Sequence, residues 1–160
     1  MNWDEFRAAA PELADLGREL FDKTGLGMLG TIRLDGSPRV TPCEVYMVEG
    51  DLMLGMMWQS RKALDLIRDP RLAAHSTQCN KDGTEGDFKL YGRAVDVPEP
   101  ARRERYADVV EAQINWRPPE PYHLFSMDIQ SAGYIKFGDG HRVLRWSVGR
   151  GLEHRPHPDD

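Results

Sequence analysis

Apolar residues along the chain first follow a helical spacing and then a strand-like one. In the N-terminal segment Leu13, Leu16 and Leu20 are three and four positions apart, which predicts a helix that Pro11 separates from a short lead-in. Gly25 is expected to end this helix. Beyond it, short runs of alternating apolar and polar residues lie between turns rich in glycine, proline and aspartate, which predicts strands. These runs are 28–34, 39–48, 52–58, 71–78, 88–97, 122–129, 133–137 and 141–148.

Two other segments, residues 60–68 and 101–114, have the helical spacing again. No strand–helix unit repeats, and short turns connect the first three strand-like runs, as in a meander. This order predicts a mainly β protein of the α+β type, an antiparallel barrel of about six or seven strands with peripheral helices. At 160 residues the chain is expected to form a single domain over 1–148, followed by a polar tail, 149–160, that frays.

Composition narrows the classes of partner. The chain carries 26 acidic and 21 basic residues, a formal net charge of −5, which argues against general binding to nucleic acid or to anionic membranes. No apolar run approaches the length of a membrane span and no targeting segment is evident, so we expect a cytoplasmic protein. Cys43 and Cys79 predict neither a zinc site nor a disulfide framework, and His154 and His157 in the tail suggest no metal site.

The most informative segment for chemistry is residues 59–71, QSRKALDLIRDPR, which directly follows a strand-like run. Ser60 can cap a short helix whose first turn then contains Arg61 and Lys62. The N-terminus of a helix carries partial positive charge and unpaired N–H groups, so cations there are unfavourable unless an anion binds. A phosphate would make the same groups a binding site. The alternative is a solvated basic patch that binds nothing.

Four motifs follow one another in residues 27–73, which read GMLGTIRLDGSPRVTPCEVYMVEGDLMLGMMWQSRKALDLIRDPRLA. They are D-G-x-P in the first turn, V-x-P in the next strand, S-x-K-x-x-D-L in the helix and D-P at its end. Two later runs, FKLYGRAVDV and HRVLRW, follow as a G-x-A strand and a closing strand. This order resembles the pyridoxamine 5′-phosphate oxidase-like, FMN-binding split β-barrel family over about residues 15–148.

The resemblance implies a split β-barrel that forms a homodimer and binds flavin-type cofactors at the subunit interface. Arg61 and Lys62 would hold the cofactor phosphate together with Ser60, and residues 39–43 would run beside the ring system, largely through backbone groups. Residues 56–58 would flank the ribityl chain or the ring, and the closing strand would come from the other subunit. The cofactor-binding residues implied in this way are Arg39, Val40, Thr41, Pro42, Cys43, Met56, Met57, Trp58, Ser60, Arg61, Lys62, Arg145 and Trp146.

The motifs do not separate FMN from the deazaflavin F420. Either cofactor implies an oxidoreductase that transfers hydride to or from a small organic substrate. The Arg-x-His motif that binds substrate in the pyridoxamine oxidases has no match here, so vitamin B6 oxidation is not implied, and no catalytic residue is identified. A non-catalytic flavin or tetrapyrrole carrier or sensor on the same fold is the alternative. A small oligonucleotide-binding barrel is disfavoured by the net charge.

Three further residues have two interpretations each. Glu44, among apolar neighbours in the run 39–48, is a barrel-rim residue paired with an arginine, or a contact to the ring or substrate. His75 is a satisfied strand residue or a proton donor. Trp116, just before a proline-rich stretch, either clamps a loop or reaches the cofactor through the dimer.

Overall fold

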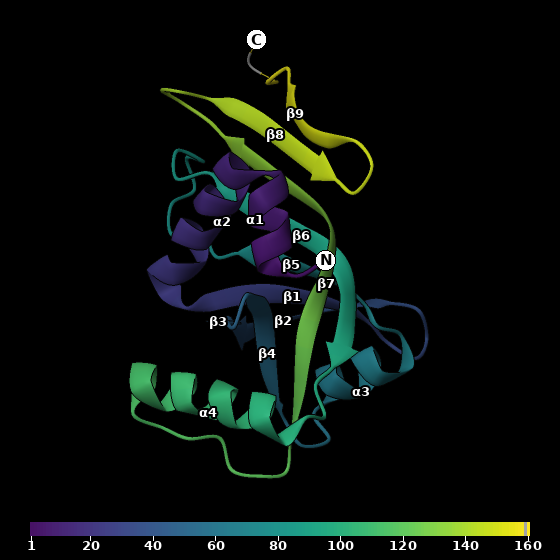
Figure 1. Ribbon diagram of the computed structural model, residues 1–160. Coiled ribbons are helices and arrows are strands. Elements are labelled where there is room, and N and C mark those ends of the chain that lie inside the picture. The colour runs from purple at the N-terminus through teal and green to yellow at the C-terminus, as the bar shows by residue number, and fades with distance from the viewer. Residues whose placement is uncertain (159) are drawn as a thin grey trace.

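The computed structural model describes residues 1–158 and 160, and it shows an antiparallel sheet wound into a barrel with helices around it (Figure 1). The helices are α1 (Trp3–Ala9), α2 (Pro11–Thr24), α3 (Arg61–Arg68) and α4 (Pro100–Ile114). The strands are β1 (Leu26–Ile32), β2 (Pro38–Glu44), β3 (Tyr46–Val48), β4 (Asp51–Met57), β5 (Arg71–Ser76), β6 (Asp87–Asp96), β7 (Tyr122–Lys136), β8 (Arg142–Ser147) and β9 (Gly151–Arg155). The predicted class, an antiparallel barrel with peripheral helices, is confirmed. Within the described residues, no helix is long and apolar enough to cross a membrane.

The barrel closes because the two ends of the strand order are consecutive in the chain. The hydrogen-bonded order is β2-β1-β5-β6-β7-β4-β3, so β2 and β3 lie at opposite ends of it. Only Val45 separates these strands in sequence, and its N–H donates to the carbonyl of Gly25 at 3.0 Å. On the inside, the Cys43 thiol lies 3.6 Å from the carbonyl oxygen of Gly55, which joins β2 to β4. This is the seam of the barrel.

The expected strand 39–48 is divided at this bend. Its first part pairs with β1 and its second part pairs with β4, from Tyr46 opposite Met53 to Val48 opposite Asp51. A single straight strand could not reach both neighbours, so the prediction of one continuous strand and a simple meander is wrong here.

The two strands expected near 122–129 and 133–137 form one long strand, β7. A bulge keeps it paired with β6 across the gap between the two expected strands. Tyr91 lies opposite Ser131, but the next residue, Gly92, lies opposite Ile129. A Cβ at Gly92 would lie 2.0 Å from the carbonyl oxygen of Asp128, so this crossing requires glycine. The register therefore shifts without ending the strand.

The tail also differs from the expectation of a frayed segment. Residues 151–155 form β9, which pairs with β8 along its length, with Leu152 opposite Trp146. His157 is buried. The edge of β8 supplies hydrogen-bond partners for residues 151–155, so this part of the tail is a strand although its composition is polar.

Two clusters of buried apolar residues make the core. The larger fills the barrel and extends under α1 and α2, where Phe6 packs against Trp146 at 4.9 Å between ring centroids. Helix α3 covers the other end of the barrel with Ala63 and Leu66. The smaller cluster lies between α4 and the outer face of β3, β4 and β7, and includes Tyr106. Figure 1 shows α3 and the β8–β9 hairpin at opposite ends of the molecule, which positions the two hollows described next.

Candidate functional site

The N-terminus of α3 presents its two cations to different places. Arg61 lines a hollow of about 570 Å³ together with Arg33, Arg39 and Arg68. Lys62 faces the other side, where its Nζ donates to the carbonyl oxygen of Pro42 at 2.8 Å. The expected pair of phosphate ligands is therefore separated: Arg61 belongs to an arginine-rich hollow, and Lys62 fastens the helix to β2.

A buried carboxylate in α3 organises the arginine-rich hollow. Asp65 Oδ2 accepts hydrogen bonds from Arg39 Nε at 2.6 Å and from the Thr31 hydroxyl at 2.9 Å, and Oδ1 lies 3.4 Å from Arg68. Burial by itself would raise the pKa of Asp65, but the hydrogen bonds from Arg39 and Thr31 outweigh it and lower the pKa. Arg39 thus holds β2 against α3, while Arg61 is left without an ion pair among the described residues.

Two hydroxyl groups near this helix end are buried without partners. Among the described residues, neither Thr41 Oγ1 nor Ser60 Oγ has a hydrogen-bond partner. Ser60 is the N-cap of α3, but its side chain makes no capping hydrogen bond. The Lys62–Pro42 hydrogen bond brings this first turn against β2, next to Thr41. Buried polar groups are nearly always paired, so orphans of this kind call for an explanation.

Alternation along β2 separates the residues predicted to lie beside a ring. Arg39, Thr41 and Cys43 point inward, whereas Val40 and Pro42 point outward and are exposed. Cys43 is buried, and burial raises the pKa of its thiol to about 11, so the side chain is an uncharged member of the core. The backbone of Cys43 pairs with Gly27 of β1, so this residue contributes to the wall of the barrel and offers no free polar group to a ligand.

The outward residues of β2, Val40 and Pro42, continue into Met57 and Trp58, and these four residues form an exposed apolar strip. Val40 is 64% exposed, Met57 is 78% exposed and Trp58 is 53% exposed, although all three are large and apolar. Met56 points the other way into the barrel. An exposed apolar surface next to a cluster of cations is typical of a binding site rather than of plain surface.

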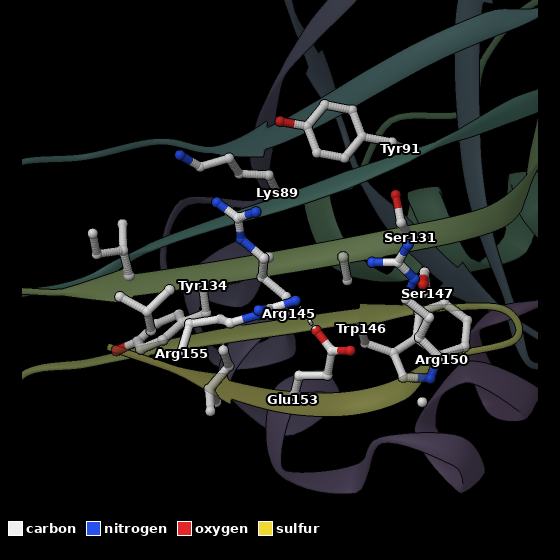
Figure 2. A pocket seen from close by; sticks show the side chains of 16 residues that line it. Lys89, Tyr91, Ser131, Tyr134, Arg145, Trp146, Ser147, Arg150, Glu153 and Arg155 are labelled. Carbon is white, nitrogen blue, oxygen red and sulfur yellow. Dashed lines mark hydrogen bonds and ion pairs between the residues drawn. The ribbon is translucent and has the colours of Figure 1, made fainter. Parts of the chain in front are cut away.

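The residues predicted from the closing strand lie elsewhere. Arg145 lines a separate hollow of about 460 Å³ on β6–β9, where Lys89, Arg150 and Arg155 also point inward and Glu153 pairs with Arg155 (Figure 2). Trp146 points into the core instead, so only its backbone borders this surface. Within one chain, this hollow and the end of α3 are at opposite ends of the molecule.

His123 was not identified from the sequence. It lies on β7 opposite Met56, stacks on Trp58 with 4.5 Å between ring centroids, and its Nε2 is buried with no hydrogen-bond partner among the described residues. The sequence does contain a signal for its burial, because His123 lies inside the apolar run YHLFSM. The stack fixes the indole of Trp58 at the mouth of the barrel.

The three residues with two interpretations are placed as follows. Glu44 is exposed, because even-numbered residues of β2 face outward, and no arginine pairs with it in the described part of the chain. His75 Nδ1 lies 2.6 Å from the carbonyl oxygen of Ser76, which is a structural role. Trp116 borders the same cavity as Trp58 within one chain. Trp116 therefore needs no partner subunit to approach the apolar strip.

Comparisons with known proteins agree on the fold. Residues 13–136 match the family model described as Pyridoxamine 5′-phosphate oxidase. No curated protein sequence matches the chain. A pyridoxamine 5′-phosphate oxidase-related, FMN-binding protein from Nostoc punctiforme is similar in structure, with a TM-score of 0.69 and 15% identity over 95% of this chain and 97% of that one.

Two further solved structures share the fold. PhzG from Burkholderia lata, in complex with tetrahydrophenazine-1-carboxylic acid, has a TM-score of 0.63 and 12% identity over 96% of this chain and 94% of that one. A heme-binding protein from Mycobacterium smegmatis has a TM-score of 0.68 and 20% identity over 86% of this chain. This chain spans only 58% of that protein's length.

Proposed function

The chain belongs to the pyridoxamine 5′-phosphate oxidase family, and on this basis we propose that it is an oxidoreductase that binds FMN, with F420 as the alternative cofactor. The reaction is a transfer of hydride to or from a small organic substrate. The flavin supplies the redox chemistry when it is bound, and the protein supplies the anchoring, the orientation and a dry surface.

The observation that carries this proposal is the pair of orphaned hydroxyls at the end of α3. Thr41 Oγ1 and Ser60 Oγ are buried without partners in the described structure. Ser60 is the N-cap directly before the unpaired Arg61, and Thr41 precedes Pro42, to which Lys62 ties this turn of the helix. A phosphate offers acceptor oxygens to both hydroxyls, to the helix N–H groups and to the guanidinium. The residues present therefore fit the phosphate end of such a cofactor.

The apolar strip fits the rest of the cofactor. Val40, Pro42 and Met57 offer apolar surface to a ring, and Trp58 is held in place by its stack on His123. Pro42 has no N–H to donate. Hydrogen bonding to β1 alternates along β2, as the bond from the Val45 N–H to the Gly25 carbonyl shows, and it directs the N–H groups of Thr41 and Cys43 toward β1. The open edge of β2 therefore offers the N–H groups of Val40 and Glu44, whose dipoles favour negative charge on a bound ring.

The proposed site is shared between two copies of the chain. Arg145 and its neighbours in Figure 2 form a positively charged hollow, but it lies far from α3 in the same chain. A second copy could bring this hollow to the cofactor that the first copy anchors. A homodimer is thus part of the proposal, and the interface is expected to bury more than about 2,000 Å² in total.

The second candidate is a non-catalytic carrier or sensor of a flavin or a tetrapyrrole. The observation in its favour is the fold shared with the heme-binding protein from Mycobacterium smegmatis. The absorbance spectrum of the freshly purified protein, followed by titration with FMN, F420 and heme, tests both candidates. Binding of a flavin that is reduced and then reoxidised by an organic acceptor faster than free flavin supports the enzyme. Heme binding without flavin binding overturns it.

A further inference from the structure

A cavity of about 580 Å³ lies next to the apolar strip and is not used by the anchoring groups described above. It is bordered by β2, β3, β4 and α4, and by the segment 116–121 that follows α4. Its volume is in the range of small-molecule sites, about 300–1,000 Å³. Most of its lining is aromatic or aliphatic: Tyr46, Met57, Trp58, Tyr106, Ile114 and Trp116, with several prolines.

The outer wall of this cavity is fixed to the rest of the molecule. Arg117 donates to Asp108 at 2.8 Å and to Glu111 at 2.9 Å, which ties the segment after α4 back onto the helix. Arg103 binds both carboxylate oxygens of Glu120, at 2.9 and 3.0 Å. These ion pairs hold the segment after α4 against the helix, so the cavity is formed before any ligand enters.

The inner wall is equally close-fitting. The Tyr106 ring crosses β4 directly over Gly55, where a Cβ would lie 2.1 Å from the hydroxyl oxygen, and it meets the Tyr46 ring edge-on at 5.5 Å. Burial raises the pKa of both phenols, and the charge of Glu44 adds to the effect. Both tyrosines are therefore neutral, and they present flat aromatic surface to the cavity.

One charged group in the lining is free to meet a ligand. The ammonium of Lys62 keeps its charge but is drawn to the backbone of β2 by its hydrogen bond to the carbonyl of Pro42, whereas the carboxylate of Glu44 makes no hydrogen bond or ion pair with any residue that the structure describes. A carboxylate only accepts hydrogen bonds, and it repels a second carboxylate in a confined space. The cavity thus combines aromatic walls with one carboxylate that has no partner in the described chain and a lysine that is held at its β2 side.

We infer that this cavity is the substrate subsite, and that it takes a planar aromatic molecule bearing an amino or similar hydrogen-bond donor rather than an aromatic carboxylate. The role as substrate subsite rests on the proposed function, because the cavity shares Pro42, Met57 and Trp58 with the surface assigned to the cofactor. A ligand in it would lie against the edge of the bound ring. The binding preference itself depends only on the cavity.

The test compares two probes of the same shape, 6-aminoquinoline and quinoline-6-carboxylate, by calorimetry at neutral pH on the full-length protein. The amine should bind at least about tenfold more tightly, the usual value of one hydrogen bond to a charged acceptor. Glu44→Gln should reduce this ratio severalfold, and Glu19→Gln, which removes an exposed acid on α2, should not change it. Equal affinity for both probes, or tighter binding of the carboxylate, would overturn the preference.

A second pair of variants tests the location. Ile114→Trp places a large ring in the cavity, whereas Ile67→Trp makes the same change on α3; the two isoleucines are 52% and 58% exposed. Loss of amine binding in the first variant alone supports the site, and equal binding in both overturns it. FMN titration is measured in parallel: a protein that binds FMN but neither probe contradicts this inference, and one that binds the amine but no flavin contradicts the proposed function instead.

Discussion

Arg61 and Lys62 are neighbours in sequence, yet their side chains line hollows on different sides of α3. Consecutive residues of a helix point about 100° apart, so the first turn faces two environments at once. Arg61 meets Arg33 and Arg39, and Lys62 meets Pro42 and the aromatic cavity. The two cations therefore have separable effects, which a double substitution would hide.

We expect Arg61→Ala to weaken FMN binding by about 1.5–3 kcal/mol, roughly 10- to 150-fold, because it removes a charge-assisted hydrogen bond to phosphate. Riboflavin, which has the same ring and no phosphate, should bind equally to variant and wild type. Fluorescence titration with both ligands measures this, with Arg18→Ala on α2 as the control for loss of a cation. An unchanged affinity for FMN would remove Arg61 from the site.

A shared site can be tested by mixing defective subunits. Arg61→Ala and Arg145→Ala should each lower FMN affinity, since they affect opposite sides of the same composite site. After dissociation and reassociation of an equal mixture, about a quarter of all sites should carry both arginines and recover tight binding. Light scattering gives the oligomeric state of each sample. A monomer that keeps full affinity would contradict the shared site.

Asp65 should make stability depend on pH in the acid range. Its pKa in the folded protein is lowered, so its contribution is fully present above the unfolded value, about 3.9, and is lost as pH falls through the folded value. Asp65→Asn leaves the partly buried Arg39 without its charged partner and should cost about 1.5–3 kcal/mol at pH 7. Denaturant unfolding at pH 7 and at pH 3 measures both effects. The difference between wild type and variant should shrink at the lower pH, and a constant difference would contradict this role.

Gly17→Ala should destabilise the protein although it improves the helix propensity of α2. The propensity gain is about 1 kcal/mol, but the new Cβ would lie 2.4 Å from the ring of Phe88, which is fully buried and cannot move away. The clash should dominate by about 1–3 kcal/mol. Gly30→Ala is the comparison, because its Cβ would have 3.6 Å to the nearest atom. Thermal unfolding measures the change in stability of each variant relative to wild type. A Gly17→Ala protein that is more stable than wild type would show that the core relaxes there.

The two cysteines should differ sharply in reactivity. Cys43 is buried, and its thiol pKa is raised to about 11, whereas Cys79 is exposed. A disulfide reagent at pH 8 should therefore modify a single thiol in the native protein and both in denaturant. Cys79→Ser should abolish the native reaction. Fast modification of Cys43 in that variant would indicate that the barrel opens at its seam.

Much of this fold can be read from the chain, for identifiable reasons. Helix α3 lies where its local sequence signals predict it, although the side chain of Ser60 makes no capping hydrogen bond there. The burial of Trp146 also follows from the sequence, because apolar Leu144 and Trp146 are two positions apart and so share one face of a strand, and both are buried. The sequence does not predict which side chains of β2 face the interior of the barrel. Residues 39–44 show no clear apolar alternation, and their orientation depends on pairing with β1.

The rest depends on contacts between distant segments. Barrel closure depends on the bend at Val45 and its hydrogen bond to Gly25, and no local pattern marks either. The orphaned hydroxyls of Thr41 and Ser60 become visible only when burial is known. The aromatic cavity unites residues from β2 to the segment after α4, so its composition could be listed from the sequence but its existence could not.

The seam between β2 and β4 makes one side of this barrel mechanically weaker than the others. In the described residues, no backbone ladder joins the two strands, and the Cys43–Gly55 contact is a weak sulfur interaction. Separating them breaks few hydrogen bonds, so the lowest-energy fluctuation of the barrel should be a hinge motion about Val45. The residues that would touch a ring, on β2 and at the end of β4, lie on the two sides of that hinge. A bound ring would therefore act as a clamp across the seam, and the ligand would serve as a structural part of the wall.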